Sequence, residues 1–530
     1  MTRSLTWSAT TDLPALQIPP RYNIAAALLD PHLAGERRDH PAVECDGRSW
    51  TYAQIAELVN RAGNGLRALG VAREQRVLIA LPDSPELIAA YLGAIRIGAV
   101  AVPCNTFFGP AEYAYFLRET RAPVVVTTRD LFAKMEAAAA PDLQVVIVDR
   151  DNEDDADGRV RAWSRWIATA SSELAAADTS KDDTAFWLWT SGSTGEPKAA
   201  VHLHQHPAWC SHLCGRGVLG LNAADRTFSA APLFHAYGLG NGLFFPFTTG
   251  ATTILNRQRK TADLVYAVIR EARPTIFFGV PTLFAAMLAV PDAESRFDLS
   301  SLRFCVSAGE PLAAELFSRW HARFGMEIID GLGSTEVLHM YVSSRPGRVK
   351  PGSSGYPVPG YEVKILNDAG DALGPNEVGD LHVKGPSTAI MYWNRREQTT
   401  QKMRGEWFVS GDKYTVDEDG YFWYAGRTDD MFKVGGEWVS PIEIESILIE
   451  HEAVLESAVV SWQEPSGILK PKAFVVLKNS RPASDDLIAE LQTFVRGRTA
   501  HYKCPRAIEF LKELPKTATG KIQRFKLRQA

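Results

Sequence analysis

Cysteine is scarce in this sequence. Only six of the 530 residues are cysteine, and they are scattered along the chain. So few thiols argue against a disulfide framework and suit free thiols in a reducing compartment. Charge of one sign is also scarce, because 57 Lys and Arg oppose 62 Asp and Glu for a net charge of −5. Without a dominant basic stripe, nucleic acid is not an expected partner.

Long uninterrupted apolar runs are missing as well. The N-terminal segment MTRSLTWSATTDLPALQIPP has no apolar core of the signal-peptide type. The two most apolar stretches, Pro85–Cys104 and His235–Leu255, are interrupted by charged residues, proline or glycine. They fit buried protein core better than membrane spans. We therefore expect a cytoplasmic protein with no membrane partner.

The sequence does contain a regular alternation of strand-like and helix-like segments. Between residues 50 and 185, short apolar runs such as Arg76–Pro82 alternate with helical patterns such as Ser84–Gly98. This alternation predicts an α/β fold with largely parallel sheets. From about Pro351, short strands at close spacing with Gly, Asn and Pro turns predict a small β-rich unit.

The length of the chain predicts two or more domains, because 530 residues are too many for one ordinary core. The residues after Arg427 have the pattern of a small α+β domain, with strands near 455–462 and 472–478. We place the boundary between Thr428 and Asp429. It divides the chain into a large N-terminal domain, residues 1–428, and a small C-terminal domain, residues 429–530.

Three strand-like segments run directly into small residues, at Thr190, Ser307 and Gly331. Ligands of parallel sheets bind at the carboxyl ends of the strands, so this convergence predicts a binding site. The first segment opens TSGSTGEPK, whose hydroxyls and backbone amides suit anionic oxygens. It is not a Walker A motif, because its glycines are too close together and proline precedes the lysine. Taken alone, it would be an ordinary Gly/Ser turn.

A cluster of histidines and cysteines has two interpretations. On a helix, His206, Cys210 and Cys214 would share one face and suit a metal ion. The spacing is not that of a zinc finger, and no second ligand pair follows. We therefore favour partly buried core residues for the whole cluster, which comprises His202, His204, His206, Cys210, His212 and Cys214.

Six short motifs follow one another along nearly the whole chain: TSGSTGEPK (Thr190–Lys198), SAGEPL (Ser307–Leu312), DGLGSTE (Asp330–Glu336), SGD (Ser410–Asp412), GRTDD (Gly426–Asp430) and PKTATGK (Pro515–Lys521). Together they resemble the core motifs of the adenylate-forming superfamily of acyl-CoA synthetases, peptide-synthetase adenylation domains and beetle luciferases. The resemblance implies that superfamily's fold, with a small mobile C-terminal domain. It also implies a reaction in which a carboxylate attacks the α-phosphate of ATP, pyrophosphate leaves, and a thiol then displaces AMP. ATP, Mg²⁺ and coenzyme A are the cofactors so implied.

The resemblance implies a role for each motif residue. Glu336 would position Mg²⁺, as a hard oxygen ligand for a hard cation, and Thr335 would contact the α-phosphate. Lys521 would bridge the acid, the α-phosphate and the ribose, where a cation stabilises the developing negative charge. The other nucleotide contacts would come from the phosphate loop, the adenine slot and the ribose clamp: Thr190, Ser191, Gly192, Ser193, Thr194, Gly195 and Lys198; Ser307, Ala308, Gly309, Glu310, Pro311, Asp330, Gly331 and Leu332; and Asp412 with Arg427.

The same resemblance implies that one small domain serves both half-reactions. Asp429 matches the hinge position, and a hinge concentrates its φ/ψ change in a few residues at the ends of elements. Rotation there would exchange Lys521 for the predicted hairpin KVGGEW. Gly435 and Gly436 of that hairpin would line the tunnel of the thiol, because a glycine pair lets a thin chain pass close to the backbone.

The acid site most resembles that of benzoate-CoA ligases, in APLFHAYGLG (Ala231–Gly240) and GLGSTEVLHM (Gly331–Met340). His235 would gate this site. Aromatic and small residues suit a planar ring, and the pocket wall would comprise Ala236, Tyr237, Gly333, His339 and Met340. Met340 stands where we expect Ile, which leaves the ring substituent open. Considered alone, His339 would more often be an interior histidine with satisfied hydrogen bonds.

These features predict an ATP-dependent ligase that activates benzoate or a substituted benzoate and passes it to coenzyme A. The alternative is a stand-alone enzyme that loads an aryl acid onto a separate carrier protein. The sequence ends nine residues after Lys521 without a carrier segment, which favours coenzyme A. A nucleotide-binding regulator without catalysis is disfavoured because Lys521, Glu336 and Asp412 are all present. The oligomeric state, monomer or homodimer, stays open.

Overall fold

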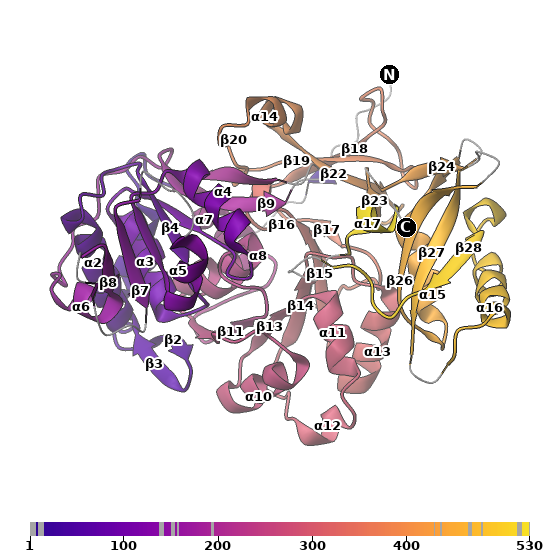
Figure 1. Cartoon of the computed structure of the whole chain (residues 1–530), viewed down its shortest axis with the longest axis horizontal. Helices are drawn as coiled ribbons and strands as arrows, with labels where there is room; N and C mark the ends of the chain where they lie inside the picture. Colours follow the sequence, from indigo (N-terminus) through magenta and orange to yellow (C-terminus); the bar gives the residue numbers. More distant parts are fainter. Residues whose placement is uncertain are drawn as a thin grey trace.

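The computed structural model describes residues 7–8, 15–136, 143–149, 154–155, 158–191, 196–428, 430–434, 437–464, 469–478, 481–516 and 522–528. Figure 1 shows the first third of the chain at the left, the middle of the chain below the centre, and the C-terminal strands at the right. No helix among these residues is both long and apolar enough to cross a membrane.

The first large sheet has eight strands in the order β20-β10-β9-β5-β4-β6-β7-β8. The pairings from β9 through β8 are parallel, whereas β10 and β20 join antiparallel at one edge. The strands are β4 (Arg76–Ala80), β5 (Val100–Pro103), β6 (Val124–Thr128), β7 (Val145–Asp149), β8 (Val160–Ala162), β9 (Thr184–Ser191), β10 (Pro197–Leu203) and β20 (Met391–Tyr392). This confirms the predicted α/β alternation.

Helices between these strands begin where the sequence offers a cap. At α3 the Ser84 side chain accepts a hydrogen bond from the Leu87 amide, and Pro85 occupies the first turn. The helices of this region are α1 (Ile24–Leu33), α2 (Tyr52–Ala68), α3 (Pro85–Arg96), α4 (Pro110–Thr120), α5 (Arg129–Glu136) and α6 (Trp163–Ala168).

The second large sheet has nine strands in the order β17-β16-β15-β14-β13-β11-β12-β2-β3. The pairings from β15 through β2 are parallel, so their carboxyl ends lie along one edge. The strands are β2 (Pro41–Cys45), β3 (Arg48–Thr51), β11 (Arg226–Ser229), β12 (Thr252–Leu255), β13 (Ile276–Gly279), β14 (Phe304–Ala308), β15 (Ile328–Gly333), β16 (Met340–Ser343) and β17 (Tyr356–Pro357).

Short helices connect the strands of this second sheet. They include two π-helices, η1 (Ser211–Arg216) and η2 (Gly240–Phe244), and one 3₁₀ turn, η3 (Thr335–Val337). The α-helices of this region are α7 (His206–Cys210), α8 (Ala236–Leu239), α9 (Phe245–Thr249), α10 (Ala262–Ala272), α11 (Pro281–Leu288), α12 (Ala293–Arg296) and α13 (Ala314–Phe324). Since π-helices in proteins are frequent at functional sites, η2 marks a candidate functional region.

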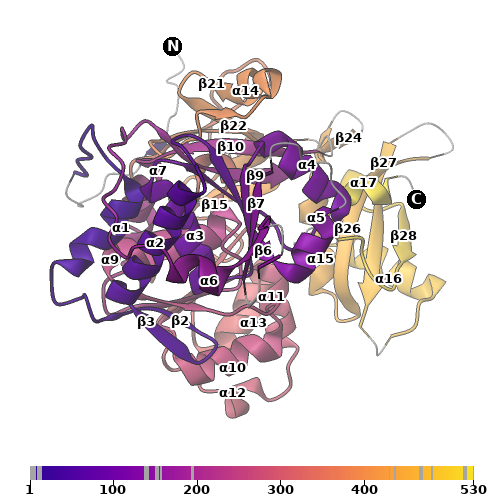
Figure 2. The same ribbon diagram turned by 60° about the vertical axis from the view of Figure 1, so that its left-hand side comes forward.

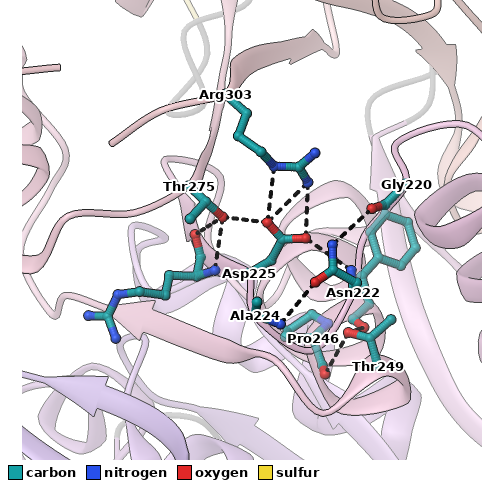
Figure 3. A network of polar contacts seen from close by, with 10 residues as sticks. Gly220, Asn222, Ala224, Asp225, Pro246, Thr249, Thr275 and Arg303 are labelled. Atoms are coloured by element: carbon teal, nitrogen blue, oxygen red, sulfur yellow. Dashed lines mark hydrogen bonds and ion pairs between the residues drawn. The ribbon is translucent and has the colours of Figure 1, made fainter. Parts of the chain in front are cut away.

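The amino ends of β11, β13 and β14 are joined by a polar network around Asp225 (Figure 3). The Arg303 guanidinium donates to both carboxylate oxygens of Asp225 over 3.0 Å. The Thr275 hydroxyl and the Asn222 amide also donate to this carboxylate, over 2.7 and 2.9 Å. The network therefore ties three parallel strands together at the edge opposite their carboxyl ends.

A smaller six-stranded sheet follows, in the order β1-β18-β19-β22-β21 with β23 paired to β22. Its strands are β1 (Trp7–Ser8), β18 (Glu362–Leu366), β19 (Gly379–Lys384), β21 (Met403–Arg404), β22 (Trp407–Val416) and β23 (Phe422–Arg427), and α14 (Arg396–Lys402) precedes β21. These antiparallel strands confirm the β-rich unit predicted after Pro351.

The C-terminal residues form a hairpin and a three-stranded sheet, which Figures 1 and 2 both show at the right-hand side. A hydrophobic core of its own, including Ile444, Val459 and Leu491, supports this part. The elements are β24 (Phe432–Val434), β25 (Glu437–Val439), α15 (Pro441–Glu450), β26 (Val454–Gln463), β27 (Leu469–Leu477), α16 (Asp485–Arg496), η4 (His501–Lys503), β28 (Ala507–Phe510) and α17 (Arg524–Leu527). The predicted α+β character is confirmed, whereas the boundary at Asp429 lies outside the described residues.

Candidate active site

Three of the six predicted motifs lie where the two large sheets meet. In the nine-stranded sheet, Ser307 of β14 pairs in register with Asp330 of β15, at the carboxyl ends of both strands. In the eight-stranded sheet, Thr190 of β9 pairs with Lys198 of β10, on either side of the phosphate-loop residues. The predicted convergence therefore draws on two sheets rather than one.

A histidine on β10 connects the two sheets at this junction. The buried His202 ring donates from Nε2 to the carbonyl oxygen of Thr335 over 2.8 Å. Its other nitrogen, Nδ1, lies 3.1 Å from Nδ1 of the buried His206. Burial lowers the pKa of His202 to about 4, so the ring is neutral at pH 7. His202 thus fixes the backbone of the DGLGSTE motif from the neighbouring sheet.

The 3₁₀ turn η3 presents Thr335 and Glu336 through an unusual backbone. The Ser334 side chain caps the turn by accepting from the Val337 amide. The next residue, Leu338, is fully buried and has a φ of +73°. A branched residue in this region is strained, and such strain persists only where the surrounding structure holds it.

The Glu336 carboxylate is buried and held from one side. The Tyr392 hydroxyl donates to its Oε1 over 2.7 Å, and the Lys198 ammonium lies 4.8 Å from the centre of the Tyr392 ring. No described residue donates a hydrogen bond to the other carboxylate oxygen, Oε2. A carboxylate with one oxygen oriented and one open fits a hard divalent cation. Sequence reasoning missed Tyr392, which no motif signals.

The predicted adenine slot contains buried polar atoms without partners. The Asp330 Oδ1 and the Ser307 hydroxyl are buried, and neither has a hydrogen bond of good geometry to a described residue, although Ser307 lies close enough to Asp330 to lower its pKa. Burial raises the pKa of Asp330 to about 8, and the nearby Ser307 and Gly331 oppose that rise only in part. Orphaned buried polar groups are rare in native proteins, so their presence here fits a polar ligand. Ala308, Gly309, Glu310 and Pro311 follow directly after Ser307, and Gly309 takes a φ of +90°.

The predicted ribose clamp is an ion pair across two strands. Asp412 of β22 and Arg427 of β23 are register partners, and the guanidinium donates to Asp412 Oδ1 over 2.9 Å. The Ser410 hydroxyl accepts from the Asp412 amide over 3.0 Å, which fixes the backbone at the motif SGD. The pair therefore holds a carboxylate in a defined orientation.

The predicted acid site centres on α8 and β16. His235 is the N-cap residue of α8, Ala236 opens the helix, and the Tyr237 hydroxyl donates to the Val306 carbonyl over 3.2 Å. The His339 ring centre lies 5.5 Å from that of Tyr237. These residues of the predicted wall are therefore brought together, with η2 packed behind them.

His339 is an interior histidine whose two ring nitrogens are both engaged. Its Nε2 lies 3.0 Å from Asn241 Oδ1, and its Nδ1 lies 3.8 Å from the Cys214 sulfur. Burial lowers its pKa to about 3. Gly240 of η2 leaves the necessary room, since a Cβ there would lie 2.3 Å from the ring. The interpretation of His339 as a satisfied core residue agrees with this geometry, and its ring still contacts the Tyr237 side of the predicted pocket.

Met340 packs directly against the DGLGSTE strand. A Cβ on Gly331 would lie 2.2 Å from the Met340 sulfur, and a Cβ on Gly333 would lie 2.8 Å from the His339 carbonyl oxygen. Both glycines, on either side of Leu332, therefore need to lack a side chain. Met340 is 1% exposed, so it belongs to the packed layer beneath this strand.

The histidine and cysteine cluster does not converge on a common point. His202 lies on β10, His206 opens α7, and Cys214 lies in η1. His204 accepts from the Ile24 amide over 3.2 Å, and burial raises the pKa of Cys210. Among the described residues, no group of three or more His, Cys, Asp or Glu is placed to hold a metal ion.

Several predicted site residues lie outside the described part of the chain, and their roles stay predictions. They are Gly192, Ser193, Thr194 and Gly195 of the phosphate loop, the hinge residue Asp429, the glycine pair Gly435 and Gly436, and Lys521. Only the backbone of Ser191 is described, as the last residue of β9.

Comparison with known proteins agrees with the motif order. Residues 31–393 match the family model described as AMP-binding enzyme, and residues 443–521 match the model of the AMP-binding enzyme C-terminal domain. The benzoate–CoA ligase of Thauera aromatica is 46% identical over 522 residues, which cover 98% of each chain. A 4-hydroxybenzoate–CoA/benzoate–CoA ligase of Rhodopseudomonas palustris is 41% identical over 512 residues, covering 96% of this chain and 94% of the relative.

Solved structures agree with the fold. The anthranilate CoA ligase AuaEII in complex with anthranoyl-AMP has a TM-score of 0.92 and 41% identity, covering 97% of this chain and 98% of its own. A benzoate CoA ligase from Burkholderia xenovorans LB400 has a TM-score of 0.88 and 44% identity, covering 96% and 100%. These likenesses confirm the expected adenylate-forming architecture. The chain belongs to the AMP-binding enzyme family.

Proposed function

We propose that this protein is an ATP-dependent aryl-CoA ligase. It activates benzoate or a substituted benzoate to an acyl-adenylate with release of pyrophosphate, and then transfers the acyl group to coenzyme A with release of AMP. The observation that carries the proposal is the end-to-end likeness to a benzoate–CoA ligase, at 46% identity over 98% of the chain. The acid–thiol ligase reaction forms one carbon–sulfur bond per ATP cleaved.

In the first half-reaction, the junction of the two sheets binds the triphosphate. Lys198 and the loop residues Thr190–Gly195 contact the β- and γ-phosphates, and Thr335 contacts the α-phosphate. Glu336 would hold Mg²⁺, and the Tyr392 hydroxyl orients its carboxylate. Mg²⁺, when bound, neutralises the charge that builds up on the phosphate oxygens. Lys521 adds a positive charge on the acid side.

Asp330 and Ser307 bind the adenine, and Asp412 with Arg427 binds the ribose hydroxyls. Support for the adenine assignment comes from the two orphaned side-chain oxygens, which a base with an amino group would satisfy. Because burial raises its pKa to about 8, Asp330 is protonated at pH 7 in the ligand-free protein.

The acid lies against Ala236, Tyr237, Gly333, His339 and Met340, with His235 at the entrance. Both nitrogens of His339 are already engaged by Asn241 and Cys214, so the histidine offers a ring face rather than a hydrogen bond. A flat apolar aryl ring suits such a wall.

In the second half-reaction, residues 429–530 act as a mobile domain. We propose that they pivot at Asp429 and exchange Lys521 for Gly435 and Gly436, which line the path of the pantetheine chain. The place of action is the cytoplasm, where ATP and coenzyme A are both available.

The deciding experiment measures CoA-dependent AMP formation with benzoate, hydroxy-, amino- and halobenzoates, cinnamate and medium-chain fatty acids. We expect turnover of one or more benzoates with free coenzyme A. Pyrophosphate release without thioester formation on free coenzyme A would favour the alternative, an enzyme that loads a separate carrier protein. Preference for a fatty acid over every benzoate would contradict the proposed substrate class.

The pivot has a separate test in the two half-reactions. Lys521→Ala should lower acyl-adenylate formation by about two orders of magnitude, because a preorganised charge at a developing anion is worth several kcal/mol. It should still form thioester from supplied benzoyl-adenylate and coenzyme A. Gly436→Leu should still form the acyl-adenylate but should not transfer the acyl group to coenzyme A. Equal loss of both steps in both folded variants would contradict the pivot.

A further inference from the structure

Three side chains from three separate elements meet at the sheet junction, with a tyrosine between the other two. Lys198 comes from β10, Tyr392 from β20 and Glu336 from η3. The Tyr392 hydroxyl donates to Glu336 Oε1 over 2.7 Å, and the Lys198 ammonium lies over the face of the same tyrosine ring, 4.8 Å from its centre. One tyrosine therefore contacts both a predicted phosphate-binding cation and the predicted metal-binding carboxylate.

Tyr392 is fixed in place independently of these two partners. It is 3% exposed, and it pairs in antiparallel register with Ala200 of β10. Its amide donates to the Thr399 hydroxyl over 3.0 Å, which anchors the strand to α14. The ring and hydroxyl therefore occupy a defined position before any ligand binds.

The segment from Ala389 to Tyr392 forms hydrogen bonds with Glu336 at two points. The Ala389 amide donates to the Glu336 carbonyl oxygen over 2.6 Å, while the Tyr392 hydroxyl holds the side chain. The backbone contact sets where the residue lies, and the side-chain contact sets which carboxylate oxygen points away. Such control of a ligating carboxylate by an outer hydrogen bond is how proteins tune metal sites.

The hydroxyl can act only as a donor to Glu336. A phenol hydroxyl donates and a carboxylate oxygen accepts, so the 2.7 Å contact between Tyr392 and Glu336 has one direction. The ring face, which carries partial negative charge, attracts the Lys198 ammonium without neutralising it. The position of Lys198 is therefore linked to that of Glu336 through one tyrosine.

We propose that Tyr392 is a positioning residue for the divalent cation that accompanies the nucleotide. It orients the open oxygen of Glu336 toward the cation and keeps Lys198 and Glu336 at a fixed separation. This inference rests on the proposed function only in assigning a metal–nucleotide complex to this junction.

The test measures cation binding rather than turnover. Mn²⁺ serves as the probe, with α,β-methylene-ATP as the nucleotide, and free Mn²⁺ is counted by electron paramagnetic resonance. Tyr392→Phe should weaken Mn²⁺ binding in the ternary complex by about tenfold, equivalent to about 1.4 kcal/mol. An unchanged Mn²⁺ affinity in folded Tyr392→Phe would overturn the proposal.

Tyr361→Phe is a matched control. The Tyr361 hydroxyl is buried and lies 2.6 Å from the Ser387 hydroxyl, which in turn donates to the carbonyl of Val337, the residue after Glu336. Removing this hydroxyl loosens the same turn without touching the carboxylate. It should change Mn²⁺ affinity by less than about twofold, or 0.4 kcal/mol. An effect as large as that of Tyr392→Phe would mean that Tyr392 is merely structural.

A double-mutant cycle separates positioning from stability. If Tyr392 acts through Glu336, then Tyr392→Phe should have little further effect on Mn²⁺ affinity in a Glu336→Gln background. Additive losses would overturn the proposal.

A fluorine label keeps the test decisive even if Tyr392→Phe does not fold. The ¹⁹F resonance of 3-fluorotyrosine at position 392 should shift when Mg²⁺ joins the nucleotide complex, and a label at position 361 should not. Absence of a shift at position 392 would count against the inference. Failure of the wild type to convert benzoyl-adenylate to thioester would instead refute the proposed function and leave these cation measurements valid.

Discussion

Two buried aspartates lie at opposite edges of the nine-stranded sheet, and they differ in their hydrogen-bond partners. Asp225 precedes β11 at the amino ends of the parallel strands and is 3% exposed. Asp330 lies on β15 toward the carboxyl ends and is 5% exposed. The two aspartates are about equally buried, so burial does not distinguish them. The hydrogen-bond donors around each carboxyl group decide whether it stabilises the fold or binds a ligand.

At the amino end, every oxygen of the carboxylate is satisfied. Arg303, Thr275 and the Asn222 amide together donate to both oxygens of Asp225, as Figure 3 shows. At the carboxyl end, Asp330 Oδ1 has no partner among the described residues, and burial raises its pKa to about 8. A paired buried carboxylate stabilises the fold, whereas an unpaired one costs stability and gains a partner only when a ligand binds. The comparison assigns stability to one edge of the sheet and binding to the other.

The largest expected effect is on stability at the amino end. Asp225→Ala removes the acceptor that joins β11, β13 and β14, deprives the Arg303 guanidinium of its carboxylate and leaves the Thr275 hydroxyl only the longer contact, 3.4 Å, to the Arg226 carbonyl. We expect a loss of about 2 kcal/mol of unfolding free energy, the lower part of the range because the Arg303 side chain is 42% exposed and can be hydrated. Urea denaturation followed by tryptophan fluorescence measures this loss.

An exposed ion pair in the connections that precede β13 and β14 provides the control for that change. Asp298 pairs with Arg273 over 2.7 Å, and both side chains are about half exposed, at 53% and 51%. Asp298→Ala should cost less than about 0.5 kcal/mol, because exposed ion pairs contribute little. Equal losses in Asp225→Ala and Asp298→Ala would remove the basis for treating the amino end as a structural network.

The next largest effect is on nucleotide binding at the carboxyl end. Asp330→Ala removes a buried carboxyl whose Oδ1 lacks a well-formed hydrogen bond among the described residues, so the unfolding free energy should stay equal or rise. The KM for ATP in pyrophosphate release should increase by about tenfold, about 1.4 kcal/mol, because the adenine loses a buried partner. Asp225→Ala, assayed at a temperature where it is folded, should leave this KM near the wild-type value. If the two substitutions exchanged their effects, the division of the sheet would be wrong.

The location of the binding edge could be predicted from the sequence. The runs ending at Ser307 and Gly331 predict strands that finish in small residues, and parallel pairing brings their ends together. The structure confirms both strands and places Ser307 beside Asp330. The helix from Pro85 was also predictable, because Ser84 and Pro85 are local capping signals.

The remaining contacts could not be predicted, because they join residues far apart in the sequence. Nothing in the sequence near Asp225 indicates that Arg303 and Thr275 are its partners. The contact between His202 and Thr335 spans two sheets, and Tyr392 reaches Glu336 only because β20 pairs with β10. Hydrophobic periodicity predicts strands, but it carries no information on which edge strand lies beside which.

A separate effect should appear in the pH dependence of stability. Since burial raises the pKa of Asp330 from 3.8 to about 8, its folded form keeps a proton that the unfolded chain loses. Its contribution is therefore fully favourable below about pH 4 and is lost as the pH rises to about 8. Asp330→Asn mimics the protonated form, so its stability relative to the wild type should increase between pH 5 and pH 8, by up to about 1.4 kcal/mol per pH unit.

The stability of Asp330→Asn must be compared with that of the wild type at each pH, because several buried histidines make the stability of both proteins change with pH in the opposite direction. Burial lowers the pKa of His202 and His204 to about 4, so both proteins lose stability as the pH falls below about 6.5. Subtracting the urea midpoints of wild type and Asp330→Asn at each pH cancels that common loss. A difference that stays constant from pH 5 to pH 9 would show that Asp330 is ionised throughout.

The smallest expected effect concerns Met340, which touches the binding edge without joining its polar groups. Its sulfur packs against Gly331, the residue after Asp330, from the antiparallel strand β16. Met340→Ile keeps the apolar contact and nearly the same volume, so the stability change should be smaller than about 1 kcal/mol. The KM for ATP should change by less than about twofold, or 0.4 kcal/mol, because no hydrogen-bonding group is altered. A tenfold rise, as large as that of Asp330→Ala, would mean that packing beneath Gly331 rather than the unpaired carboxyl governs nucleotide binding at this edge.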